Sequence, residues 1–218
     1  MSEAYIVYGA SGSGSMAVEA ALTLIGAPFR VVEAVTWEGD AERDKVAGVN
    51  PMRQIPALVT PQGETLTESA AILLWLTERH PEAGLAPPPR DVTRGQFLRW
   101  MSFIPAEIYS MYWVRDVPSR LVGDDAATQG LMLERTLDRI ADCWGVMESQ
   151  VEPGRFVLGD RLTVLDLYVC VVSRWSPRRK RFAQVAPRLA EVARRVDDLP
   201  ELADFWARRW PFATGEDR

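Results

Sequence analysis

The chain has 218 residues, 47% of them apolar and 25% charged, and this globular composition speaks against a disordered protein. Its net charge of −5 argues against a nucleic-acid backbone as the main partner, because such binders carry a clustered positive surface. The apolar runs end far short of the ~20 residues that a bilayer demands, and Met1 to Ala4 form no basic leader, so we expect a cytoplasmic protein without a membrane partner.

The first 84 residues mix strand and helix periodicities. In chain order the expected elements are a strand at 5–8, a glycine and serine loop at 9–15, a helix from residue 16, a strand at 29–35, two short strands at 57–60 and 64–66 around a turn, and a helix at 69–79. The order βαβ, a loose middle segment, then ββα is what a thioredoxin-like α/β domain with a mixed sheet requires. We therefore expect such a domain over 1–84.

A proline-rich segment, Leu85 to Pro89, separates this domain from the rest of the chain. Successive prolines favour extended geometry, so we expect a stiff linker over 85–90. Pro105 falls inside the first helix that follows and should kink it, because its ring removes one hydrogen bond. Over 91–218 the pattern predicts an all-α domain, with helices at about 91–115, 124–150, 163–175, 187–197 and 200–210.

Residue types that bind metals or exchange disulfides are scarce. Cys143 and Cys170 are the only cysteines and form no C-x-x-C, so we expect two core residues rather than a disulfide, a zinc site or a redox pair. His80, the single histidine, precedes Pro81 at a helix end and is interpreted as a surface or capping residue, with no metal to bind. The basic run at 178–181 is interpreted as a solvated turn.

The segment from Asn50 to Leu58 places Pro56 at the mouth of a strand, directly after the β-branched Ile55. Such a proline is a candidate for a cis peptide bond. A cis bond here would turn the backbone of Ile55 outward and leave its N–H and C=O free to pair with an extended peptide, as an added strand does. On its own, the segment is explained equally well by a plain tight turn.

Shortly after Pro56, an acid and a hydroxyl stand at the start of a helix, at Glu68 and Ser69. A helix start exposes unpaired N–H groups and a positive dipole end, which suit a carboxylate, and Glu68 can accept an ammonium group nearby. The alternative is ordinary capping of the helix by Thr67 or Ser69. Capping explains one residue well, but not a set of groups that matches the zwitterion of an amino acid.

Together, these patterns resemble a known family. The runs N-P-x-x-Q-I-P-A-L at 50–58 and L-T-E-S-x-A-I at 66–72 are similar to the glutathione site of the glutathione S-transferase family. A third run, at 159–168, resembles the family's structural capping box, in which Thr163 caps a helix and Asp166 bonds back. The resemblance covers essentially the whole chain, in the right order and spacing.

The resemblance implies where glutathione binds as co-substrate. Gln54 and the backbone of Ile55, next to Pro56 and Arg53, would meet the cysteinyl region of glutathione. Glu68 and Ser69 would hold its γ-glutamyl end. The resemblance also implies a homodimer with a role in detoxification.

The first loop is where the sequence departs from the family. Residues 9–15 resemble the loop of the bacterial beta class, but Gly14 stands where that class has its cysteine, which excludes a cysteine mechanism. A hydroxyl must then help to hold glutathione as its thiolate. Ser13 is our first choice for this donor, with Ser15 and Ser11 as close rivals. The alternative is that these serines only cap the helix and loosen the loop.

The helix after the linker offers an aromatic face for an electrophile. We expect Phe103 and Ile104 to be core residues, and Tyr109 and Tyr112, whose hydroxyls need partners, to line a pocket with Trp113. Tyr109 aligns with a histidine of the beta class, so its hydroxyl would replace an imidazole as a polar contact.

Three functions are compatible with these residues. The first is a glutathione transferase that conjugates the thiol to a small apolar electrophile, by stabilising the thiolate and holding the reactants together. The second is a family member that binds glutathione or a partner protein without catalysis, because its loop lacks the cysteine. The third is a glutathione-dependent reductase or peroxidase, which the missing cysteine disfavours.

Overall fold

The computed structural model describes residues 4–175 and 179–211 of the chain. Its α/β part holds a four-stranded sheet, in the order β2-β1-β3-β4, made of β1 (Tyr5–Gly9), β2 (Phe29–Glu33), β3 (Ala57–Val59) and β4 (Thr65–Thr67). Strands β1 and β2 run parallel, whereas β3 is antiparallel to both of its neighbours. This is the mixed sheet of the thioredoxin-like fold that the sequence predicts.

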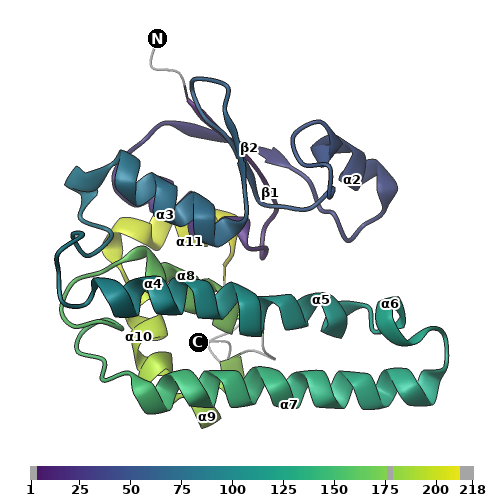
Figure 1. Ribbon diagram of the computed structural model, residues 1–218. Helices are drawn as coiled ribbons and strands as arrows, with labels where there is room; N and C mark the ends of the chain where they lie inside the picture. Colours follow the sequence, from purple (N-terminus) through teal and green to yellow (C-terminus); the bar gives the residue numbers. More distant parts are fainter. Residues whose placement is uncertain (1–3, 176–178, 212–218) are drawn as a thin grey trace.

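Two helices of the α/β part lie between its sheet and the helical part of the molecule. Helix α1 (Ser15–Ile25) packs against α3 (Ser69–Arg79) and against α8 (Val164–Ser173) of the helical part, and Figure 1 shows α3 above the helical layer. The predicted bounds of α3 are confirmed. Because Tyr5, Val7 and Gly9 of β1 are buried while Ile6 and Tyr8 are half-exposed, one face of the strand supplies the core beneath the sheet.

The expected loose segment between the second and third strands is wrong in part. Helix α2 (Asp40–Ala47) occupies it, beside the sheet. The helix buries a single residue, Val46, and most of its other side chains are charged. A helix with so narrow an apolar stripe leaves no 3.6-residue periodicity in the sequence, so periodicity could not reveal it.

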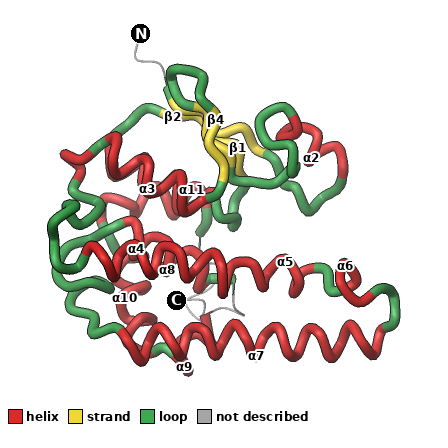
Figure 2. Tube along the Cα trace, viewed as in Figure 1, coloured by secondary structure: helices red, strands yellow, loops and turns green. Residues whose placement is uncertain are grey.

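The rest of the chain is helical, as predicted, and Figure 2 shows it without strands. After the short 3₁₀ turn η1 (Pro81–Ala83), the helical segments are α4 (Arg94–Phe103), η2 (Ile104–Tyr109), α5 (Ser110–Asp116), α6 (Ser119–Val122), α7 (Ala126–Gln150), α8 (Val164–Ser173), α9 (Lys180–Val185), α10 (Pro187–Asp197), η4 (Pro200–Leu202) and α11 (Ala203–Arg209). The predicted bounds of α10 are confirmed.

Pro105 lies in a π-helical segment rather than in a simple kink. The segment η2 joins α4 to α5, so the single helix expected over 91–115 is three consecutive helical pieces. A π-helical turn is wider than an α-turn and accommodates the missing N–H of a proline. Its effect on the site is to set the direction of the residues at its end, Tyr109 among them.

Helix α8 forms the centre of the helical part. Every one of its residues is buried, and it packs against α1 and α10. The predicted capping box is confirmed: the Thr163 N–H donates to Asp166 Oδ2 at 2.8 Å, and the Thr163 hydroxyl donates to the same oxygen at 2.9 Å. The Val157 N–H also donates to Asp166, at 2.7 Å. Asp166 thus organises the loop before α8 as well as its first turn.

Three smaller predictions also meet the structure. Cys143 and Cys170 are buried, as expected. His80 ends α3 as its C-terminal cap residue, and its Nε2 lies 2.9 Å from the Tyr5 hydroxyl. The solvated basic turn is wrong for Arg179, which is buried and paired with the equally buried Asp197, because a charge inside a protein requires a partner. Residue 178 of that run lies outside the described residues.

Within the described ranges, none of the helices is both long and apolar enough to cross a bilayer. The same residues contain no group of three or more histidine, cysteine, aspartate or glutamate side chains placed to hold a metal ion.

Candidate functional site

The peptide bond between Ile55 and Pro56 is cis, as expected from the sequence. Just before it, the Asn50 amide donates to the Gln54 carbonyl at 2.9 Å and accepts from the Met52 N–H at 3.0 Å, which fixes the loop leading into β3. In the part of the chain that the structure describes, the N–H and C=O of Ile55 make no hydrogen bond. A free backbone donor and acceptor therefore stand side by side next to the sheet.

The start of α3 is unusual at Glu68. This residue precedes the helix with φ = 64°, a left-handed conformation that L-residues other than glycine rarely adopt. Such strained residues cluster at functional sites. Glu68 is exposed, and its carbonyl still accepts the Ile72 N–H at 2.9 Å. The conformation exposes the first N–H groups of α3 beside an acidic side chain.

The alternative interpretation of this segment, ordinary capping, is wrong. Among the described residues, no side chain caps the start of α3. The Ser69 hydroxyl is instead buried and lies 2.8 Å from the Tyr168 hydroxyl of α8. Ser69, the residue after Glu68, therefore joins the α/β part to the helical part.

Arg53 contacts neither Glu68 nor Ser69 among the hydrogen bonds and ion pairs of the described residues. Its guanidinium pairs with Asp44 at 2.5 Å and donates to the Asp40 carbonyl at 3.3 Å, so it is tied to α2. Gln54, the next residue, is exposed. Both residues lie in the loop that ends at the cis bond.

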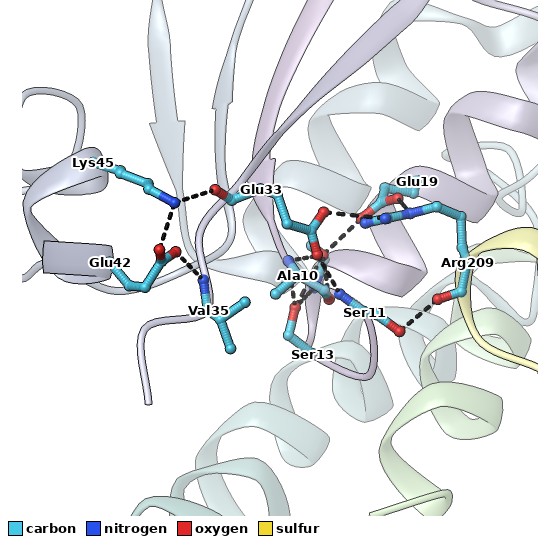
Figure 3. Close-up of polar contacts among 10 residues, drawn as sticks. Ala10, Ser11, Ser13, Glu19, Glu33, Val35, Glu42, Lys45 and Arg209 are labelled. Atoms are coloured by element: carbon cyan, nitrogen blue, oxygen red, sulfur yellow. Dashed lines mark hydrogen bonds and ion pairs between the residues drawn. The ribbon is translucent and has the colours of Figure 1, made fainter. Parts of the chain in front are cut away.

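The first loop, whose Ser11 and Ser13 are labelled in Figure 3, is organised by hydrogen bonds of its serines. The Ser13 Oγ lies 2.9 Å from the Ser15 Oγ and accepts the Ser15 N–H at 3.1 Å. Ser15 is wholly buried and donates to Glu19 at 2.8 Å. Ser11 is exposed and donates to the Arg209 carbonyl at 2.6 Å. The three candidate serines therefore differ in what their hydroxyl protons can reach.

A buried ion pair lies under this loop, and sequence analysis missed it. Glu19 of α1 is wholly buried, and Arg209 at the end of α11 donates to it at 2.7 and 3.2 Å. Arg209 also reaches Glu33 of β2 at 3.1 Å, and Figure 3 shows the three side chains meeting beside Ser11. Burial raises the pKa of Glu19, while Arg209 and Ser15 oppose that rise. A glutamate on the apolar side of α1 was the only sequence signal for this pair.

Tyr109 reaches the first loop from the helical part. A Cβ on residue 14 would collide with the Tyr109 hydroxyl oxygen and would lie 3.0 Å from ring carbons Cε1 and Cζ. Position 14, where the resemblance to the beta class would place a cysteine, therefore lies next to a tyrosine hydroxyl in this chain. Sequence analysis placed Tyr109 in a pocket but did not bring it to Gly14.

The other aromatic residues divide between core and surface. Tyr109 and Tyr112 both pack edge-on against Trp175, with ring centroids 4.6 and 5.2 Å away, and the Trp175 N–H donates to the Gly12 carbonyl at 2.7 Å. Trp113 is 44% exposed, and its ring lies 4.6 Å from the Arg120 guanidinium. The two residues expected in the core, Phe103 and Ile104, are packed against it, Ile104 being wholly buried.

Both parts of the chain are similar to known proteins. Residues 15–79 match the family model "Glutathione S-transferase, N-terminal domain", and residues 121–209 match "Glutathione S-transferase, C-terminal domain". The chain is 30% identical over 203 residues to the uncharacterized GST-like protein YncG of Escherichia coli K12, covering 93% of this chain and 97% of that protein. It is 25% identical over 197 residues to glutathione S-transferase GstA of Escherichia coli O157:H7, covering 88% and 92%.

A solved structure is similar over nearly the same length. The glutathione transferase homolog from sulfitobacter, crystallised with bound glutathione, superimposes with a TM-score of 0.84. The superposition covers 94% of this chain and 98% of the other chain. At 22% sequence identity, this similarity concerns the fold.

Proposed function

Because this chain belongs to the glutathione S-transferase family, we propose that it activates the thiol of glutathione and conjugates it to a small apolar electrophile. The observation that carries the proposal is the unbonded backbone of Ile55 beside the exposed, strained helix start at Glu68. The Ile55 backbone offers strand-like hydrogen bonds, and the start of α3 offers the Glu68 carboxylate next to free N–H groups. A tripeptide with a zwitterionic end needs both.

Glutathione binds in this proposal as an added strand. The N–H and C=O of Ile55 pair with the backbone of the cysteinyl residue, with Gln54, Arg53 and Pro56 around them. The γ-glutamyl carboxylate lies on the first N–H groups of α3 at Ser69, and Glu68 accepts the ammonium group. Glu68 is exposed and, among the residues that the structure describes, forms no ion pair, which supports this role.

Ser13 donates to the sulfur in this proposal. Because the Ser15 hydroxyl donates to Glu19, the Ser13 hydroxyl is the donor in its contact with the Ser15 Oγ, and in this proposal its proton turns from there toward the ligand. Ser15 and Ser11 have acceptors elsewhere, on Glu19 and on the Arg209 carbonyl, which leaves Ser13 as the first choice. A donated hydrogen bond stabilises the thiolate, and the thiol proton passes to water. The sulfur then bonds to the electrophilic carbon, and the bond from that carbon to its leaving group breaks; with an aryl chloride, chloride departs with the bonding electrons.

The electrophile lies against the aromatic residues of η2 and α5 in this proposal. Tyr109 and Tyr112 are held by Trp175, and Trp113 is exposed nearby on α5. Tyr109 and Trp113 offer apolar ring area to the electrophile, whereas Tyr112, at 3% exposure, lies in the core and packs against Trp175 from inside. We propose in addition that the protein is a cytoplasmic homodimer, as the family resemblance implies.

A second candidate, glutathione binding without conjugation, is favoured by one observation. The Ser13 hydroxyl oxygen already has Ser15 and the Ala10 N–H within 3.4 Å, so its contacts are satisfied inside the loop. A reductase or peroxidase is less well supported, because Cys143 and Cys170 are both buried and burial raises the pKa of each thiol.

Two measurements on the same protein distinguish these candidates. Calorimetric titration with glutathione tests binding, and turnover of an aryl chloride with glutathione tests conjugation. The proposed transferase binds glutathione and turns over the chloride. Binding without turnover would favour the second candidate, and turnover of a mixed disulfide alone would favour the reductase.

A further inference from the structure

The hydroxyl of Tyr109 occupies the space that a side chain at position 14 would fill. Gly14 directly precedes α1, and a Cβ there would collide with this hydroxyl oxygen. The Gly14 backbone has φ = −63° and ψ = −15°, values that any residue adopts. The reason for a glycine at this position is therefore room for the tyrosine, and not backbone freedom.

The Tyr109 ring is fixed from two sides. Trp175 packs edge-on against it at 4.6 Å, and Tyr168 lies 6.5 Å away, ring centroid to ring centroid. Tyr109 is also the last residue of the π-helical segment η2. π-helical turns within helices are rare and are found frequently at functional sites, because they redirect a side chain. The hydroxyl is thus held at the first loop by the packing of the helical part.

Among the described residues, the Tyr109 hydroxyl is a hydrogen-bond donor without an acceptor. Burial raises the pKa of Tyr109 well above its usual value, and the Glu68 carboxylate raises it further, so the phenol keeps its proton at neutral pH. The phenol oxygen lies at the Gly14 backbone, where it would collide with a Cβ. Among residues 4–175 and 179–211, no acceptor receives the Tyr109 O–H.

We propose that Tyr109 is a catalytic residue that donates a hydrogen bond to the glutathione sulfur, together with Ser13 of the first loop. This inference rests on the proposed function. The phenol keeps its proton throughout, and the thiol proton passes to water. The sulfur is then held between one donor from each part of the molecule, and the missing loop side chain at position 14 is replaced by a side chain from η2.

The first test compares Tyr109→Phe with the matched control Tyr8→Phe, which removes a hydroxyl from β1 instead. We expect Tyr109→Phe to bind glutathione within about threefold of the wild type, because the peptide edge and the α3 start are intact. We expect the pKa of its bound thiol, titrated by ultraviolet absorbance, to rise. The thiolate should bind its proton about tenfold more tightly or more, because it has lost a hydrogen bond to its charge. Tyr8→Phe should match the wild type.

The second test uses Gly14→Ala, because its new methyl group displaces the hydroxyl without removing it. We expect the same rise in the ionisation pKa of the bound thiol, and no further rise in Gly14→Ala/Tyr109→Phe, since both changes remove one interaction. An unchanged thiol ionisation in Tyr109→Phe, with glutathione bound, would overturn the role of Tyr109 alone. If the wild type bound no glutathione, the proposed function and this inference would both be overturned.

Discussion

Arg209, the last residue of α11, holds the buried carboxylate of Glu19 in α1, 190 positions earlier in the chain. The same arginine accepts the Ser11 hydroxyl on its carbonyl and reaches Glu33 with its guanidinium. Next to it, the Trp210 ring lies against Gly12, at 3.4 Å from the place a Cβ would take there. The end of the described chain therefore fixes the loop that carries Ser13.

Arg209→Ala should destabilise the fold, because it leaves the Glu19 carboxylate buried without its ion partner. Loss of one member of a buried pair costs about 3 to 5 kcal/mol, and we expect roughly 2 to 4 kcal/mol because the Arg209 side chain is 25% exposed. Urea denaturation measures the change in the free energy of unfolding. Arg208→Ala, an exposed neighbour on α11, is the control. Equal midpoints for the two variants would contradict the role given to the ion pair.

Ser13→Ala should raise the pKa of the bound glutathione thiol and slow conjugation. Removing one donor from a site that stabilises an anion costs between about tenfold and a thousandfold in turnover. Ultraviolet titration of the bound thiol and the rate with an aryl chloride measure the two effects. Ser11→Ala, whose hydroxyl donates to the Arg209 carbonyl, is the control. A larger effect in Ser11→Ala than in Ser13→Ala would reverse the assignment.

Glu68→Gln should weaken glutathione binding without changing the ionisation of the thiol. The amide keeps the size of the side chain but loses the charge that attracts the ammonium group, so we expect a loss of about tenfold in affinity. Calorimetry measures it, with Glu64→Gln in the turn before β4 as the matched control. A glutathione analogue without its amino group should bind both proteins alike. Weaker binding of that analogue to Glu68→Gln would show that Glu68 acts in another way.

Asp166 should make the fold lose stability as the pH rises from about 4 to about 6. Burial raises the pKa of its carboxyl from 3.8 to about 6, against hydrogen bonds from Val157 and Thr163. In that range the folded protein holds a proton that the unfolded chain has released, so its contribution is complete below pH 4 and is lost by pH 6. A shift of about two pKa units corresponds to about 3 kcal/mol.

Urea denaturation of the wild type and Asp166→Asn between pH 4 and 7 isolates this contribution. The difference in free energy of unfolding between the two proteins should shrink as the pH rises, because the asparagine does not titrate. A difference that grows with pH would mean that the native state prefers the carboxylate.

The fold was predictable where short-range rules decide the structure. The bounds of α3 followed from its polar start and Pro81, and the cis bond was one of two interpretations of Ile55 and Pro56. Helix α2 could not be found, because only Val46 is buried on it. Arg179 looked solvated because its partner, Asp197, lies 18 positions away in the chain.

The candidate site was predictable as a set of residues but not as an arrangement. Glu68 and Ser69 follow from a motif, yet the bond from Ser69 to Tyr168 spans 99 positions. The meeting of Gly14 with Tyr109 depends on the π-helical turn at Pro105 and on packing against Trp175. No local pattern encodes contacts of that kind, because they form only when the helical part closes on the first loop.

A crystal structure of the protein with glutathione tests the central claim most directly. The account predicts the cysteinyl backbone within hydrogen-bond distance of the N–H and C=O of Ile55, with the γ-glutamyl group at Glu68 and Ser69. Glutathione bound elsewhere, with the Ile55 backbone still unpaired, would contradict it.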